Sequence, residues 1–171
     1  DQQALLEKYD AESNIRKVTG VFKTIIYLLL LVFSLFQLYT AIFGQYPAQI
    51  QRTVHLGFGL TLIFLLFPAR RKGLKHKIAW YDYILALIAV AVGSYWVLNY
   101  ETLVQSLGQL STMDFYIGLA AILLVLEAAR RAVGLPITII AVLFLLYAYF
   151  GRHMPDFMAH RGQSIDSIVN L

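Results

Sequence analysis

The chain has 171 residues, of which 59% are apolar and only 14% are charged, and its formal net charge is +4. A soluble domain is about a quarter charged, so this composition excludes an ordinary water-exposed surface. Cysteine is absent, which excludes disulfides, thiolate metal sites and cysteine nucleophiles. We therefore expect an all-α, multi-pass membrane protein.

Five apolar segments follow one another along the chain, and a helix needs about 20 residues to cross a ~30 Å hydrocarbon core. We predict spans at 21–43, 52–67, 78–100, 115–130 and 135–150. Residues 1–20 mix apolar side chains with charges of both signs, which predicts a cytoplasmic interfacial helix. Residues 151–171 are too polar to span, although Ser164 can cap a short helix there.

Cationic residues mark alternate ends of these spans. They gather before the first span, after the second and after the fourth, at Lys8, Arg16, Lys17, Lys23, Arg70, Arg71, Lys72, Lys75, Lys77, Arg130 and Arg131. The loop over 101–114 has no lysine or arginine. The positive-inside rule therefore places the N-terminus in the cytoplasm. Because the cations flank apolar runs and form no stripe with aromatic residues, we expect no nucleic-acid partner.

The stretch VLEAARRAVG places Glu127, Arg130 and Arg131 between two apolar runs. A charge at the centre of a bilayer costs roughly 2.5–3.5 kcal/mol on insertion scales, so these residues are expected at a membrane surface. Gly134 and Pro136 then break the helix and start the next one. The arginines can extend to phosphate headgroups, and Glu127 stands four residues before Arg131, a favourable order for an ion pair.

Polar residues within the spans are candidate functional sites. Gln37 is expected to form an interhelical amide hydrogen bond, and His55 an interfacial one. No second histidine lies within a span, which argues against a haem held by two histidines. Asp82 is expected to form a membrane-edge ion pair with the nearby 75–77 lysine cluster. A proton or sodium site is the alternative reading for Asp82 and for Glu127.

Packing and depth can also be predicted for the third span. Trp80 opens it, as expected of an aromatic residue at the membrane interface. Ala89 and Gly93 have the i,i+4 spacing of small residues that lets helices approach closely. We find no nucleophile elbow, paired-carboxylate site or phosphate loop, so no enzyme activity and no cofactor are expected of this chain.

Several stretches together resemble the TAXI subfamily of the tripartite ATP-independent periplasmic (TRAP) transporters. They are EKYDAESNIRKVTG, FSLFQLYTAIFG, QRTVHLGFGLTLIFLLFPARRK, WYDYILAL, VLEAARRAVG and LLYAYFGRHMPDFMAHRG. The likeness covers nearly the whole chain, and Ala11 stands where a proline would be expected. These transporters combine a periplasmic substrate-binding protein, a small four-helix membrane subunit and a large elevator-type subunit. In the TAXI subfamily the two membrane parts are commonly one fused polypeptide, so the large subunit is expected as a separate or a fused partner.

The resemblance implies a role for each region. Residues 21–134 look like the four-helix small subunit, 135–150 like a connecting helix, and 151–171 like the start of the large subunit. The coupling cation, sodium or a proton, is then expected in the large subunit, so no substrate or cation residue is carried over. The implied function is a scaffold in the bacterial inner membrane, in contact with lipids, for import of organic acids. The alternatives are a membrane anchor of an electron-transfer complex and a small oligomeric transporter acting alone.

Overall fold

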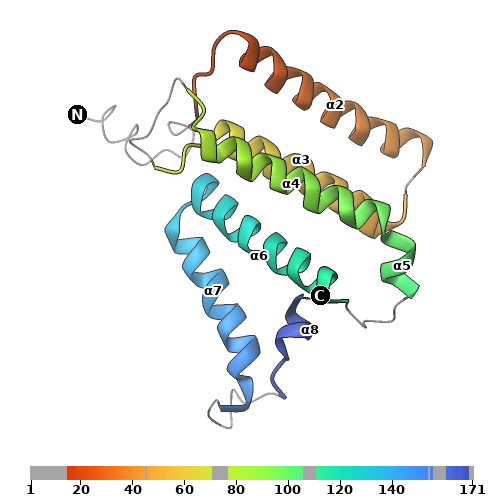
Figure 1. Ribbon diagram of the computed structural model, residues 1–171, viewed down its shortest axis with the longest axis vertical. Coiled ribbons are helices and arrows are strands. Elements are labelled where there is room, and N and C mark those ends of the chain that lie inside the picture. Colours follow the sequence, from red (N-terminus) through yellow and green to blue (C-terminus); the bar gives the residue numbers. More distant parts are fainter. Residues whose placement is uncertain are drawn as a thin grey trace. The chain divides into compact units, whose positions relative to one another are not determined.

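The computed structural model describes residues 15–44, 46–70, 77–105, 111–153, 155 and 161–169. Within these ranges the regular elements are all helical, so the predicted all-α fold is confirmed for this part of the chain (Figure 1). They are α2 (Val21–Phe43), α3 (Ala48–Leu66), α4 (Trp80–Leu98), α5 (Tyr100–Gln105), α6 (Thr112–Ala132), α7 (Leu135–Phe150), the 3₁₀ helix η2 (Gly151–His153) and α8 (Ile165–Val169). The chain divides into two compact units, Asp1–Leu98 and Asn99–Leu171.

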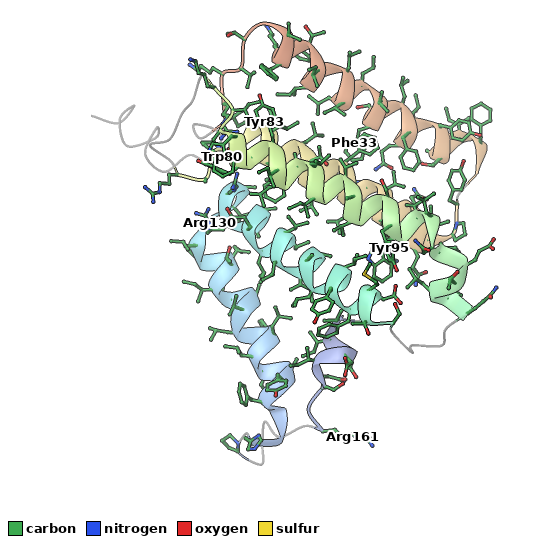
Figure 2. All side chains as sticks on the ribbon, in the orientation of Figure 1. Phe33, Trp80, Tyr83, Tyr95, Arg130 and Arg161 are labelled. Carbon is green, nitrogen blue, oxygen red and sulfur yellow. The ribbon has the colours of Figure 1, made fainter. Side chains whose placement is uncertain are left out.

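Three of the helices, α2, α4 and α6, are long and apolar enough to cross a membrane. Large apolar side chains are exposed along them and along α7, for example Leu28, Leu35, Leu87, Leu143 and Phe144. Figure 2 shows such side chains projecting from the ribbon. Contiguous apolar surface of this extent is unfavourable in water and suits a lipid environment. The chain is therefore described as a multi-pass membrane protein.

The helix bounds correct the predicted spans in several places. The first and fifth predicted spans coincide with α2 and α7, but α7 has only 16 residues. The predicted span at 52–67 is a helix that begins earlier, at Ala48, and its first turns carry Gln51, Arg52 and His55. These polar residues keep α3 out of the set of helices apolar enough to span. The count of four spans plus a connecting span accordingly stays a prediction.

The third and fourth predicted spans differ from the observed helices in length. The third ends at Leu98, and a separate short helix, α5, follows from Tyr100. The fourth extends to 112–132, because Ser111 and Asp114 form a capping box that starts the helix three residues early. The Asp114 N–H donates to Ser111 Oγ at 3.2 Å, and the Ser111 N–H donates to the Asp114 carboxylate at 2.9 Å.

The first unit is built on the packing of α3 against α4 (Figure 1). Gly57 and Gly93 let the two backbones approach: a Cβ built on Gly93 would lie 3.5 Å from the Gly57 Cα. Ala89, one turn before Gly93, is buried. The predicted close-approach pair Ala89 and Gly93 is therefore confirmed, and its partner is Gly57 on α3. Helix α2 packs against α3 through ring contacts such as Phe33–Phe58, whose ring centroids are 5.2 Å apart.

The second unit is an α6–α7 hairpin with α8 returning beside it. Gly134, at φ +124°, makes the turn between the two long helices, and Pro136 lies in the first turn of α7, as predicted. After α7 the chain reverses, and the Gln163 N–H donates to the Ala148 carbonyl at 2.8 Å. The segment then runs back to α6, where a Cβ on Gly118 would clash with the Val169 side chain. Gly118 thus leaves the space that α8 occupies.

The predicted cap of the last helix is confirmed. The Ser167 N–H donates to Ser164 Oγ at 3.1 Å, which satisfies one of the unpaired donors of the first turn of α8. Of the predicted interfacial helix over 1–20, residues 1–14 lie outside the described residues, and residues 15–20 form no helix before α2 begins at Val21. Most of the cationic loop after α3 and part of the 101–114 loop also lie outside the described residues.

Candidate functional site

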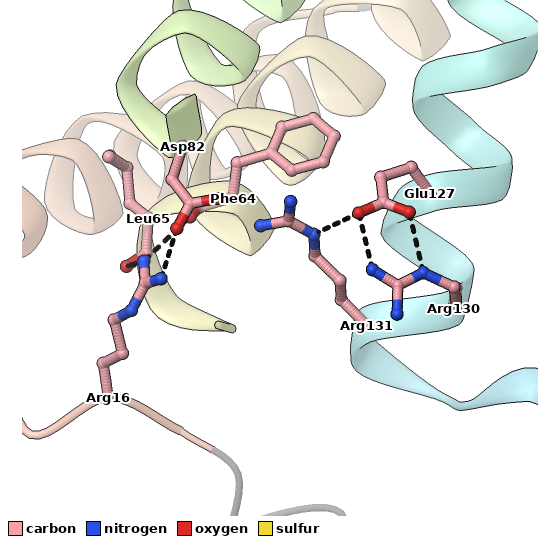
Figure 3. A network of polar contacts seen from close by, with 7 residues as sticks. All are labelled: Arg16, Phe64, Leu65, Asp82, Glu127, Arg130 and Arg131. Atoms are coloured by element: carbon pink, nitrogen blue, oxygen red, sulfur yellow. Dashed lines mark hydrogen bonds and ion pairs between the residues drawn. The ribbon is translucent and has the colours of Figure 1, made fainter. Parts of the chain in front are cut away.

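The end of α3 and the start of α4 are joined by Arg16, which precedes α2 (Figure 3). Its Nη1 donates to the carbonyls of Phe64 and Leu65 at 3.2 and 3.1 Å, and its backbone N–H donates to the Leu66 carbonyl at 2.8 Å. Its Nη2 forms an ion pair with the carboxylate of Asp82, in the first turn of α4. One arginine therefore connects three parts of the first unit.

The electrostatics of this contact favour both partners. Carbonyls in the last turn of a helix have no partner within the helix and carry the negative end of its dipole, so the Arg16 guanidinium is stabilised there. Asp82 lies at the positive end of the α4 dipole. The side chains of Arg16 and Asp82 are 1% and 0% exposed. Because both charges are removed from water, each offsets part of the desolvation cost of the other.

This geometry corrects the prediction for Asp82. An ion pair was expected with the lysine cluster over 75–77, but the partner that the structure shows is Arg16, 66 residues earlier in the chain. Lys75 itself lies outside the described residues. One sequence signal narrowed the choice of acidic partner: Asp82 is the single acidic residue between positions 13 and 100, so a buried cation in that stretch has no other acidic partner within it.

The second charged cluster closes the last turns of α6. Glu127 accepts from Arg130 Nε at 2.8 Å and Nη2 at 2.7 Å, and from Arg131 Nε at 2.7 Å (Figure 3). The predicted Glu127–Arg131 pair is thus confirmed, and Arg130 adds a two-pronged contact that sequence spacing had not assigned. The side chain of Arg130 is 33% exposed, but that of Arg131 is only 2% exposed. The expectation that Arg131 extends to headgroups is therefore wrong, because its side chain is buried and its Nε donates to Glu127.

A third polar cluster joins α2 to α3. Gln37 Nε2 hydrogen-bonds to His55 Nδ1, as expected of an interhelical amide bond. Thr40 Oγ1 donates to the Gln37 carbonyl at 3.0 Å and accepts from Gln51 Nε2 at 3.4 Å. The His55 ring also packs edge-on against Phe33, with centroids 5.0 Å apart. Sequence reasoning found Gln37 and His55 separately but did not pair them.

The hollows of the first unit differ in their lining. One, of about 480 Å³, is apolar and is bordered by residues of all three long helices, including Leu29, Phe58 and Val90. Another, of about 570 Å³, lies between α2 and α3 and is lined by Gln37, Ala48, Gln51, Arg52, His55 and Leu56. This second hollow brings a charged side chain together with several hydrogen-bonding ones.

Trp80 differs from the other predicted site residues, because it makes no polar contact in the described part of the chain. Its side chain, labelled in Figure 2, is 73% exposed at the start of α4. The centroid of its ring lies 6.0 Å from the centroid of the Tyr81 ring. This exposure suits an indole at the membrane interface, where its ring is amphipathic enough to lie at headgroup depth. Among the described residues, no group of three or more histidine, aspartate or glutamate side chains could hold a metal ion.

Comparison with known proteins adds no family to these observations: no protein-family model, no curated protein and no solved structure matches the chain.

Proposed function

We propose that this chain is the membrane scaffold of a TRAP-type secondary transporter that imports organic acids delivered by a periplasmic binding protein. In this proposal it braces a large elevator-type subunit, which binds the substrate and the coupling cation, sodium or a proton. The scaffold lies in the bacterial inner membrane with its N-terminus in the cytoplasm. The 44–51 and 101–114 loops then face the binding protein. The resemblance of the sequence to the TAXI subfamily is the source of the substrate class and the partners.

The observation that supports a scaffold role is that the carboxylates of Asp82 and Glu127 are both engaged in ion pairs near helix ends. The carboxylate of Asp82 is occupied by Arg16, and that of Glu127 by Arg130 and Arg131. A carboxylate already neutralised by a guanidinium is a poor site for sodium or for a proton carried across the membrane. This favours structural roles for Asp82 and Glu127 over the alternative reading of both as cation sites.

Helix continuity supports the same role. A transporter site is usually built where spanning helices are interrupted and expose backbone groups at mid-membrane. Helices α2, α4 and α6 run without interruption for 23, 19 and 21 residues. Continuous helices, with the end of α3 and the start of α4 joined by the buried Arg16–Asp82 pair, suit the fixed frame that an elevator mechanism needs beside its moving part.

Reconstitution tests the proposal directly. The chain alone, in proteoliposomes with an imposed sodium or proton gradient, should take up no labelled dicarboxylate or other organic acid. Addition of the large subunit and the binding protein should give uptake that depends on the gradient. Uptake by the chain alone would replace the scaffold by a small oligomeric transporter. A haem absorption spectrum of the purified chain would instead support the electron-transfer anchor.

A further inference from the structure

The hollow between α2 and α3 combines features that a scaffold alone does not need. Its wall holds the Arg52 guanidinium, the amides of Gln37 and Gln51, and the imidazole of His55. Its volume of about 570 Å³ lies in the range of small-ligand sites, about 300–1,000 Å³. Arg52 and His55 are both exposed, so the hollow is open to the surroundings of the helices.

The side chains around this hollow can donate hydrogen bonds to an anion. Gln37 Nε2 hydrogen-bonds to His55 Nδ1, and the amides of Gln37 and Gln51 and the imidazole of His55 carry N–H donors. With Arg52 beside them, the hollow presents donors and a positive charge, which is the chemistry that binds an oxyanion.

Arg52 has no acidic neighbour to neutralise it in this part of the first unit. Among the described residues of α2, α3 and α4 the one acidic side chain is Asp82, which is paired with Arg16 at the far end of α3. Arg52 and the Phe64 carbonyl that Arg16 caps are 12 residues apart on α3, or about 18 Å along its axis. An anion in the hollow supplies a counter-charge to Arg52 in this part of the unit.

We propose that this hollow binds the phosphate of an anionic phospholipid. Arg52 lies about 6 Å along α3 from the first residue of the helix, Ala48. An arginine this close to a helix end can place its guanidinium at the depth of the lipid headgroups. At that depth the phosphodiester is the abundant oxyanion, and the exposed apolar side chains of α2 provide a surface for the acyl chains. Arg52 carries the charge, and the amides of Gln37 and Gln51 add hydrogen-bond donors. The inference does not depend on the transporter proposal.

Native mass spectrometry of the detergent-solubilised chain tests the site, with dioleoyl phosphatidylglycerol as the probe. Dioleoylglycerol, which has the same acyl chains and no phosphate, is the chemical control. We expect phosphatidylglycerol to bind about tenfold more tightly than dioleoylglycerol, and Arg52→Gln to lower its affinity about tenfold. Lys77→Gln, which removes a cation before α4, should leave that affinity unchanged.

Three results would overturn the proposal. The first is equal affinity for the two lipids in the unmodified chain, a comparison that needs no variant and so holds even if Arg52→Gln does not fold. The second is an Arg52→Gln variant that folds and binds phosphatidylglycerol as the unmodified chain does. The third is inorganic phosphate binding as tightly as the lipid, since the site would then recognise a free anion in place of a headgroup.

Discussion

Arg16 and Asp82 are 66 residues apart in the chain, yet they form an ion pair in which both side chains are almost fully buried. The same guanidinium caps the carbonyls of Phe64 and Leu65. The segment before α2 is therefore tied to the end of α3 and the start of α4 by one side chain. A buried pair contributes little net stability over an apolar pair, but loss of one partner leaves an uncompensated charge.

We expect Arg16→Gln to destabilise the first unit by about 3–5 kcal/mol, because Asp82 then loses the guanidinium that offsets its buried charge. Lys17→Gln is the matched control, since Lys17 is the exposed neighbour of Arg16 and has the same charge. Thermal unfolding of the two variants in the same detergent measures the difference. Equal unfolding temperatures would show that the ion pair is not essential to the fold.

The double variant Arg16→Met, Asp82→Leu separates the charge effect from the cap. Removal of both charges should restore part of the stability lost in the single variant, because no buried charge is left unpaired. Recovery should be incomplete, since the Phe64 and Leu65 carbonyls still lack their donor. Full recovery in thermal unfolding would mean that the cap contributes nothing.

Glu127→Gln should lower the free energy of unfolding by about 1–3 kcal/mol and reduce the yield of folded protein. The cation dependence of transport in the complete system should stay unchanged. A neutral amide cannot balance the two guanidinium groups that Glu127 now accepts from, and Arg131 is buried. Glu101→Gln, an exposed acid in α5, is the control for loss of charge alone. A changed cation stoichiometry with normal yield would place Glu127 in the coupling mechanism instead.

Gly118→Ala should displace the returning segment from α6, because the new Cβ would overlap the Val169 side chain and lie 3.2 Å from the Val169 carbonyl oxygen. Overpacking of this kind costs about 1–3 kcal/mol. Gly59→Ala, in α3, is the control: nothing lies within 4 Å of its Cβ, and alanine favours the helix by about 1 kcal/mol. Protease cleavage near Ser164 should increase in the first variant only.

Single-cysteine labelling in intact cells tests the predicted topology, and the chain has no native cysteine to interfere. We expect position 75 to be protected from a membrane-impermeant maleimide and position 109 to be labelled, because cationic loops stay in the cytoplasm. Both positions lie outside the described residues, so this prediction rests on charge asymmetry alone. Labelling of position 75 from outside would invert the proposed orientation.

Local features of this protein were determined by the sequence itself. The apolar run over 21–43 coincides with α2, and Gly134 with Pro136 sets the turn between α6 and α7. The Glu127–Arg131 contact also follows from spacing, since residues four apart lie on one helix face. Each of these depends on neighbours within one or two helical turns, which is the range over which backbone geometry dictates position.

Partner choice between helices was decided only by the tertiary structure. Arg16 with Asp82, Gln37 with His55, and Gly57 with Gly93 are pairs whose members lie on different segments. Hydrophobic periodicity predicts that a helix buries a face, but not which helix covers it or in what register. That register follows from the close approach of α3 and α4 at their glycines and from the need of each buried polar group for a partner.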